Sequence, residues 1–231
     1  MRPSQIRFAA LFVLAVAPAT ALLAADGDLD PTFSDDGQLT RAYPLDQPVA
    51  DVRLAVEPGG GLLTSSRLSS STVGLVRYEA NGDVDSAFGA LGSRVLTLRT
   101  QSATWDDLPG IHILASGHFL VVGSESGEQT FAPRVARLTA GGDLDTTFGG
   151  DGYVDVPGLP GTPAPERNYE VLASALDSQG RILVAGSCNL CPANVDRDAW
   201  VLRLLADGTP DPGFGAGGWA IFDPTGGEDD A

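Results

Sequence analysis

The sequence lacks lysine altogether, and this absence accompanies a strongly acidic composition. All 14 basic residues are arginine, against 30 aspartates and glutamates, which gives a formal net charge of −16. A surface of this charge repels phosphate backbones, so we expect no nucleic-acid partner. The same charge favours solubility and could attract cations.

Long apolar runs are also missing, except near the N-terminus. Arg2 and Arg7 precede the apolar stretch 8–17, and small residues follow it. This three-part pattern is typical of a secretory signal peptide, and the run is too short to anchor the chain across a bilayer. We therefore predict a signal peptide at 1–25, a secreted location, periplasmic or extracellular, and no membrane span after cleavage.

No familiar catalytic signature is present. The sequence has no Gly-x-Ser-x-Gly elbow, no phosphate-binding glycine loop and no pair of carboxylates at a telling spacing. His112 and His118 could act as general bases, but a histidine in a predicted strand is more often structural. We therefore predict a non-enzymatic protein. The alternative is an extracellular hydrolase or lyase whose site lies in a central channel, because such a site leaves no local motif.

What the sequence does contain is one short phrase that returns four times. Each copy starts with a glycine, has a phenylalanine six residues later, and has another glycine four residues after that. The copies start at Gly27, Gly82, Gly142 and Gly208. A fixed phrase at nearly regular intervals indicates a repeat architecture.

The residues of the phrase have predictable structural roles. We expect its second aspartate to close an Asx-turn, its phenylalanine to pack between neighbouring repeats, and its trailing glycine to adopt a positive φ. An arginine five residues before three of the phrases should pair with these aspartates between repeats. The structural repeat motif consists of Asp30, Phe33, Asp85, Phe88, Asp145, Phe148, Asp211 and Phe214.

Short apolar and β-branched runs between turn residues predict four strands in each repeat. We expect the strand after the phrase to open each unit, at 38–43, 94–98 and 153–156, which leaves 219–222 over. The runs Phe119–Val122 and Ile182–Ala185 are continuously apolar. Such strands are buried on both faces, as in sheets that stack on one another.

Two segments resemble the signatures of the delta-60 repeat family, namely 137–152 and 177–186. The copies cover nearly all of the chain after the leader. The fourth copy departs from the pattern, because Thr209 and Pro210 replace an aspartate and an apolar residue. The resemblance implies a β-propeller-like, secreted or surface-exposed bacterial protein. It implies no catalytic residues, because the family is largely uncharacterised.

The predicted fold is all-β, with antiparallel four-stranded units stacked as propeller blades. Within 26–231 the units are expected at 27–81, 82–141 and 142–207, with a partial unit at 208–231. Three units and a leftover strand make an incomplete propeller, because rings usually have four to eight blades. Either the chain is a fragment of a longer protein, or a second chain or missing blades close the ring.

Cys188 and Cys191 form a CxxC motif in a loop after a predicted strand. A small disulfide fits an oxidising compartment, and we predict one. Redox chemistry would need a cysteine at a helix N-terminus, and structural zinc would need four ligands. The chain adds only His112 and His118, which lie in another repeat, so both remain alternatives.

Asp26, Asp28 and Asp30 have the spacing of the first three ligands in a calcium loop. Pro31 and Gly37 stand where an EF-hand has its glycine and its bidentate glutamate. Turn-forming aspartates explain the pattern without a metal. We therefore predict no cofactor, and calcium remains the alternative.

The repeats predict a binding or structural module at the cell surface. The loops Arg67–Ser71, Ser124–Ala132 and Cys188–Asp198 differ in length and sequence while the frame repeats. Variable loops on a rigid frame are where binding residues gather. The expected partner is a protein or glycan at the cell surface. A purely structural segment of a larger assembly is the alternative.

Overall fold

The computed structural model describes residues 28–39, 52–69, 71–98, 110–126, 131–156, 158, 168–189 and 197–222. This part of the chain forms β-strands and no α-helix. Its described residues accordingly contain no helix that could cross a membrane. The predicted signal peptide lies outside the described residues and stays a prediction.

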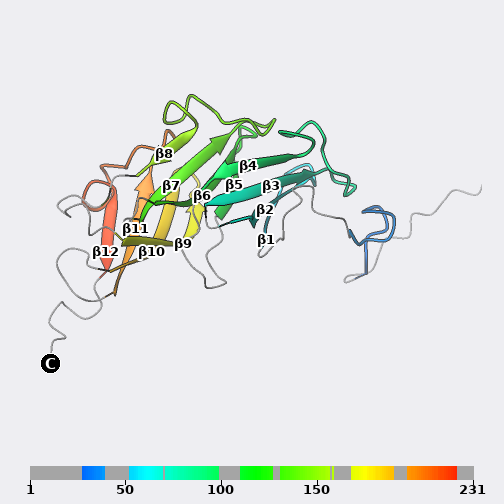
Figure 1. Cartoon of the computed structure of the whole chain (residues 1–231). Helices are drawn as coiled ribbons and strands as arrows, with labels where there is room; N and C mark the ends of the chain where they lie inside the picture. The colour runs from blue at the N-terminus through cyan, green and yellow to red at the C-terminus, as the bar shows by residue number, and fades with distance from the viewer. Residues whose placement is uncertain are drawn as a thin grey trace, which may run out of the picture.

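The strands form three antiparallel four-stranded sheets, which follow one another in chain order (Figure 1). The first sheet contains β1 (Val52–Val56), β2 (Leu62–Arg67), β3 (Thr72–Tyr78) and β4 (Ser93–Thr97). The middle sheet contains β5 (Gly110–Ile113), β6 (Phe119–Ser126), β7 (Phe131–Leu138) and β8 (Tyr153–Asp155). The third contains β9 (Asn168–Leu176), β10 (Ile182–Asn189), β11 (Arg197–Leu204) and β12 (Trp219–Phe222). A parallel pairing of one residue pair, Phe131 in β7 with Asn168 in β9, links the middle sheet to the third. The predicted all-β, incomplete propeller is confirmed.

The prediction of which strands share a sheet is wrong by one strand. The strand after each phrase pairs with the strand before it: β4 pairs with β3, β8 with β7, and β12 with β11. The phrase is short, so it brings its two flanking strands together as neighbours. Residues 219–222 are therefore not left over, because they complete the third sheet. The segment 40–43 lies outside the described residues.

Two hydrophobic cores separate the three sheets. Phe119 and Val121 of β6 belong to the core between the first and middle sheets, and Leu120 and Val122 to the core between the middle and third sheets. All four side chains are buried. The expectation that 119–122 is buried on both faces is confirmed, because successive side chains of a strand point to opposite faces.

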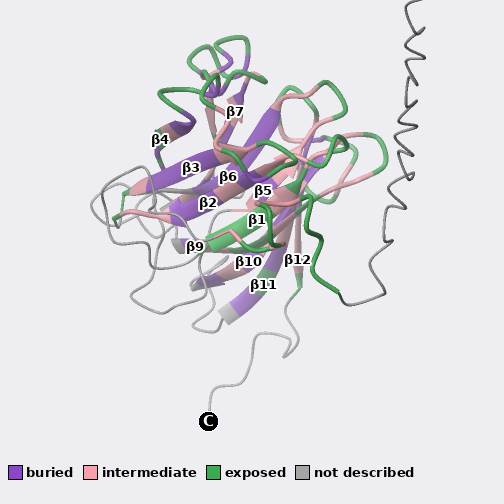
Figure 2. Cartoon of the chain, turned by 90° about the vertical axis from the view of Figure 1, so that its right-hand side faces the viewer, coloured by how far each residue is buried: buried purple, intermediate pink, exposed green. Residues whose placement is uncertain are grey.

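The first strand, β1, is much more exposed than the other strands of its sheet (Figure 2). Most of β3 is buried, whereas β1 exposes Val52, Leu54 and Val56 by more than half of each side chain. The sequences of these strands are similarly apolar. Exposure of β1 therefore reflects its position at one end of the stack.

An aromatic cluster fills the core beside the third sheet. The ring of Tyr169 lies 5.0 Å from Trp219 and 6.0 Å from Trp200, and the two indoles are 5.2 Å apart. All three side chains are at most 2% exposed. Contacts of this kind add to the burial energy of each ring, and they fix β12 to the rest of its sheet.

Candidate functional site

The second aspartate of each phrase closes an Asx-turn, as expected. In the third copy the amide and hydroxyl of Thr147 donate to Oδ1 of Asp145 at 3.0 and 2.6 Å. The hydroxyl bond is the main cause that lowers the pKa of Asp145. The equivalent amide bonds are donated by Thr32 to Asp30, by Ala87 to Asp85 and by Gly213 to Asp211.

The arginine before the phrase binds the same aspartate through its other oxygen. Arg137 Nε donates to Asp145 Oδ2 at 2.7 Å, and Arg203 makes the equivalent bond to Asp211 at 2.8 Å. Arg137 lies near the end of β7, and Asp145 lies in the phrase that connects β7 to β8 of the same sheet, so the expectation that this ion pair joins neighbouring repeats is wrong. The neighbour is reached by another atom, because Arg137 Nη1 donates to the carbonyl of Ala206 at 3.2 Å.

The phenylalanine of a phrase packs on the first glycine of the next phrase. Phe88 and Phe148 are fully buried. A Cβ at Gly142 would lie 2.8 Å from the Phe88 ring, and one at Gly208 would lie 2.7 Å from the Phe148 ring. The expected packing of the phenylalanine between repeats is confirmed at these two junctions. The trailing glycines Gly37, Gly92, Gly152 and Gly218 have φ of 79°, 88°, 92° and 98°, also as expected.

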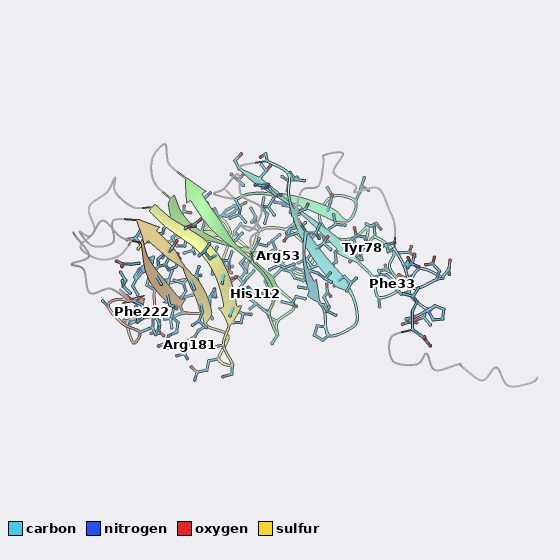
Figure 3. All side chains as sticks on the ribbon, turned by 90° about the horizontal axis from the view of Figure 1, so that it is seen from below. Phe33, Arg53, Tyr78, His112, Arg181 and Phe222 are labelled. Carbon is cyan, nitrogen blue, oxygen red and sulfur yellow. The ribbon has the colours of Figure 1, made fainter. Side chains whose placement is uncertain are left out.

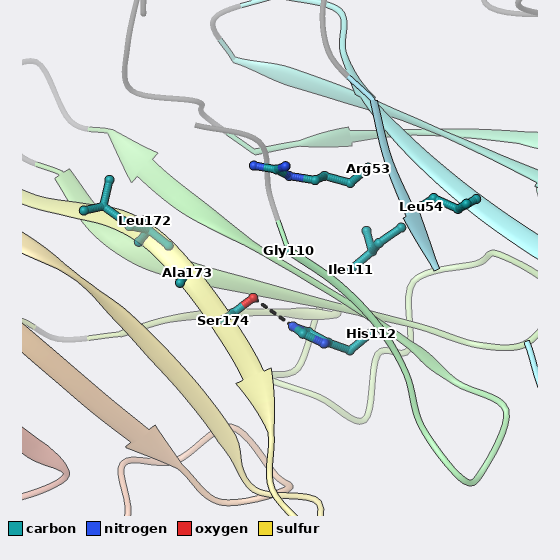
Figure 4. A pocket seen from close by; sticks show the side chains of 9 residues that line it. Arg53, Leu54, Gly110, Ile111, His112, Leu172, Ala173 and Ser174 are labelled. Atoms are coloured by element: carbon teal, nitrogen blue, oxygen red, sulfur yellow. Dashed lines mark hydrogen bonds between the residues drawn. The ribbon is translucent and has the colours of Figure 1, made fainter. Parts of the chain in front are cut away.

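A cavity of about 280 Å³ lies where the inner strands of the three sheets meet (Figure 4). Its walls come from Arg53 and Leu54 of β1, from 110–112 of β5 and from 171–174 of β9. Each sheet contributes one strand, so the stacking of the sheets creates the cavity. It is therefore the best candidate for a functional site in the described part of the chain.

His112 and Ser174 meet across this cavity. His112 Nε2 and Ser174 Oγ are 2.8 Å apart, within hydrogen-bonding distance (Figure 4). Burial lowers the pKa of His112, which favours the neutral imidazole. A Cβ at Gly110 would lie 1.8 Å from Ser174 Oγ, so glycine is required beside this serine. A neutral imidazole and a hydroxyl can bind a ligand, and they also resemble a general base with its nucleophile.

Arg53 brings positive charge to the lining of the cavity. Its side chain is exposed and extends away from β1 (Figure 4). The remaining walls include the apolar side chains of Leu54, Ile111 and Val171. In a protein of net charge −16, a cationic group at an apolar cavity favours ligands that carry a negative charge.

The two histidines singled out from the sequence lie in different places. His112 lines the cavity, whereas His118 lies at the hairpin before β6. There His118 Nδ1 is 3.1 Å from Ser116 Oγ, and Nε2 is 3.6 Å from Asp145. His118 thus belongs to the polar cluster around the repeat motif.

Other predicted site residues are only partly covered by the structure. Cys188 is buried near the end of β10 and is disulfide-bonded, but its predicted partner Cys191 lies outside the described residues, so the pairing of the two stays a prediction. Asp26 is also outside them, whereas Asp28 and Asp30 are exposed. Among the described residues no three His, Cys, Asp or Glu side chains could together hold a metal ion. The three variable loops also include undescribed residues.

Sequence reasoning missed Arg53 and Ser174. Each is an isolated polar residue in an apolar strand, and no motif links them to His112. The predicted order of the strands also drew attention away from Arg53 and Ser174. It made the strand that follows each phrase line the central channel, whereas β1, β5 and β9 line the cavity. Counting polar residues in the second predicted strand of every unit would have been the one available signal.

Three segments of the chain match the model of a family described as "Domain of unknown function (DUF5122) beta-propeller", at residues 60–88, 113–148 and 178–214. Each segment begins at the hairpin before the second strand of a sheet and ends at the phenylalanine of a phrase. The family is of the delta-60 repeat type, so the resemblance is confirmed at the level of the β-propeller repeat. No curated protein matches the chain.

Two similar solved structures are "Drosophila Semaphorin 1b, extracellular domains 1-2" and "Drosophila Plexin A in complex with Semaphorin 1b". Both are 15% identical to the chain over 66% of its length, with TM-scores of 0.27 and 0.26. The chain spans 40% and 39% of the length of these two chains. Likeness at this level says nothing about ligands.

Proposed function

The chain is a β-propeller repeat protein, and from this premise we propose that it is a secreted, non-enzymatic binding module. Its ligand site is the cavity between β1, β5 and β9. The observation that carries the proposal is the convergence of Arg53, His112 and Ser174 from three different sheets on one cavity. Apolar walls with a few convergent polar groups are typical of ligand sites.

The chemistry of the cavity favours a carboxylate. The guanidinium of Arg53, which also has an interaction within the chain, supplies charge, and the hydroxyl of Ser174 supplies a donor beside His112. A cavity of about 280 Å³ is too small for a whole polymer. It therefore accepts one acidic group of a larger partner, such as an acidic sugar of a glycan or an acidic residue of a surface protein.

The test measures binding of two probes by titration calorimetry: a uronic acid oligosaccharide and an acidic peptide. Arg53→Gln removes the charge at the cavity, and Arg94→Gln is the matched control on an exposed ion pair away from it. We expect Arg53→Gln to weaken binding of one probe at least tenfold and Arg94→Gln to leave it unchanged. Equal affinities of wild type and Arg53→Gln would overturn the proposal.

The same experiment tests the proposal that no cofactor takes part. Dialysis against a chelator should leave the affinity for the acidic probe unchanged. A loss of binding that added calcium restores would instead support the calcium alternative.

A hydrolase is the second candidate function, favoured by the hydrogen bond between His112 and Ser174. A fluorophosphonate probe reacts with activated serines, so it would label Ser174 in an enzyme of this kind. Under the binding proposal the wild type is not labelled above the Ser174→Ala variant. Labelling of Ser174 that is lost in His112→Gln would establish the enzymatic alternative.

A further inference from the structure

The cavity between β1, β5 and β9 contains one group whose charge changes near neutral pH. His112 points into it, with Nε2 2.8 Å from Ser174 Oγ (Figure 4). An unperturbed imidazole titrates at about pH 6.5. Figure 3 shows Arg53 and His112 near the middle of the structure, between Phe33 at one end and Phe222 at the other. The charge of His112 is therefore a property of this cavity.

The walls of the cavity supply no counter-charge for a protonated His112. Within the described part of the chain, none of the residues that line the cavity is acidic, and the other ionisable one, Arg53, is itself positive. Burial lowers the pKa of His112, since an imidazolium is poorly solvated there. The chain's own groups therefore keep the ring neutral at neutral pH.

The acidic residues of the strands packed on β5 stand several positions from the ring. These strands are β1, β6 and β9, and β1 contains no acidic residue. On β6, Glu125 lies five positions beyond the cross-strand partner of His112. On β9, Glu170 lies four positions before Ser174 and accepts a hydrogen bond from Ser187 Oγ at 2.9 Å. A negative charge beside the ring therefore has to come from a ligand.

A proton on His112 also changes what Ser174 offers to a ligand. A neutral imidazole can accept a hydrogen bond at Nε2, and the hydroxyl of Ser174 is then used as its donor. An imidazolium can only donate, so Ser174 Oγ accepts from Nε2 and its own hydrogen is left for a ligand. One proton thus adds both a positive charge and a free donor to the same wall of the cavity.

We propose that an acidic ligand enters this cavity together with a proton, which His112 takes up. The inference rests on the proposed function, and it adds that the bound state is a carboxylate facing both Arg53 and an imidazolium. The proton comes from the solvent, binds the unprotonated nitrogen of the ring, and returns to the solvent when the ligand leaves. No bond of the ligand is made or broken. The ligand supplies the negative charge that the walls lack.

The affinity of the cavity for acidic ligands should accordingly depend on pH. Without a ligand the pKa of His112 is below its ordinary value, and a bound carboxylate raises it, because an opposite charge favours the charged ring. Affinity is therefore lowest above the raised pKa. It increases as the pH falls between the two pKa values, by up to about tenfold per pH unit, and is constant below the lower one.

Titration calorimetry of the uronic acid oligosaccharide and the acidic peptide tests this between about pH 5.5 and 7.5, where carboxylates stay ionised. We expect the probe that binds to gain at least about fivefold in affinity from the upper to the lower pH. At about pH 6.5 the heat of binding should differ between two buffers of unlike ionisation enthalpy, and the difference should correspond to the uptake of a proton.

Two variants assign the proton to its residue, because the chain has only two histidines, His112 and His118. His112→Gln keeps an amide that can bind Ser174 but takes up no proton, so its affinity should not rise at low pH. His118→Gln is the matched control and should keep the full rise, because His118 lies at the hairpin before β6, 3.6 Å from Asp145.

Nuclear magnetic resonance of the histidine rings gives a second readout that needs no variant. The titration midpoint of His112 should move to higher pH when the probe is added, because the bound carboxylate favours the imidazolium. The midpoint of His118 should stay where it is. This measurement decides the question even where His112→Gln loses the far-ultraviolet spectrum of the wild type.

The outcomes separate this inference from the proposed function. A midpoint of His112 and an affinity that both ignore the pH and the probe, with Arg53→Gln still weakening binding, would overturn the inference alone. A rise in affinity that persists in folded His112→Gln would overturn it too, because the proton would then belong to another group. If neither probe binds at any of these pH values, the inference and the proposed function both fail.

Discussion

At the scale of single residues, the lack of a side chain on the first glycine of a phrase determines how neighbouring repeats join. The phenylalanine of one phrase occupies the place where a side chain on the next phrase would be. Gly142 therefore serves two purposes at once, a φ of 84° and room for the ring of Phe88. The conformational requirement is shared by many turns, whereas the packing requirement is specific to the junction.

Replacing Gly142 by alanine separates these two requirements when Gly180 is the control. Gly180 has a φ of 73° and no atom within 4 Å of the place of a Cβ, so Gly180→Ala carries only the backbone cost, about 1 kcal/mol. Gly142→Ala adds a clash with Phe88 and should lose about 1–3 kcal/mol more. Urea denaturation measures both. Equal losses would show that the ring of Phe88 moves aside freely.

The lowered pKa of Asp145 predicts how stability depends on acid. Thr147 and Arg137 favour the ionised carboxylate in the folded protein. Its contribution is therefore present above the unfolded pKa of about 3.9 and is lost as the pH falls through the lower folded value.

Asp145→Asn should accordingly flatten the fall of unfolding free energy below about pH 4. The amide can keep the Asx-turn but not the charge. Asp143→Asn is the control, because the side chain of Asp143 is 79% exposed and pairs with Arg94 at 3.4 Å. Denaturant titrations at several pH values give the slopes. An unchanged slope in Asp145→Asn would assign the acid sensitivity to other carboxylates.

At the scale of elements, the strand after each phrase completes the sheet that precedes it. β12 has only four residues, yet Trp219 fixes it by packing against Tyr169 and Trp200. A short edge strand is weakly held by its ladder alone. Its side-chain contacts therefore determine whether the third sheet has three strands or four.

Trp219→Ala should lower the unfolding free energy by about 3–5 kcal/mol, because it empties a large part of this core. Val95→Ala is the control on the equivalent edge strand β4, where the side chain is 47% exposed. That change should cost no more than about 0.5 kcal/mol. Far-ultraviolet circular dichroism during denaturation reports both. A small loss for Trp219→Ala would mean that β12 contributes little to the fold.

At the scale of the whole molecule, the three sheets form a chain of neighbours. The middle sheet shares a core with each of the others, and those two share no core among the described residues. Stability in such stacks is approximately a sum of unit and nearest-neighbour terms. A destabilising substitution in the middle sheet should therefore lower the stability of both other sheets. One in an end sheet should lower the stability of the middle sheet only.

Leu138→Ala and Leu204→Ala test this spread at equivalent positions of the middle and third sheets. Both leucines are fully buried, so each change should cost about 2–5 kcal/mol. Hydrogen exchange should rise in all three sheets for Leu138→Ala. For Leu204→Ala it should stay unchanged in β2 and β3. Faster exchange in those strands with Leu204→Ala would show a single cooperative unit instead.

Much of the fold could be predicted from the sequence because its causes are local. An Asx-turn needs only an aspartate and the next few amides. A continuous apolar run such as 119–122 predicts a strand that is buried on both faces. The partner of each strand was harder to predict. It depends on how the phrase folds back on β7, where the amide of Asp145 donates to the carbonyl of Arg137 and the side chain of Arg137 binds the Asp145 carboxylate.

The cavity could not be predicted, because its parts are ordinary when taken singly. His112 was noticed, but its partner Ser174 lies 62 positions away in another sheet. Arg53 is one of 14 arginines, and no spacing distinguishes it from the others. Only the approach of three inner strands gives these side chains a common site.

The sequence by itself determined the repeat, its turns and the two-sided burial of its central strands, since hydrogen bonds and apolar periodicity act over a few residues. Tertiary structure alone decided which strand closes each sheet and which polar groups meet at the junction of β1, β5 and β9. These depend on the geometry with which one sheet packs on the next, and packing joins residues that have no relation along the chain.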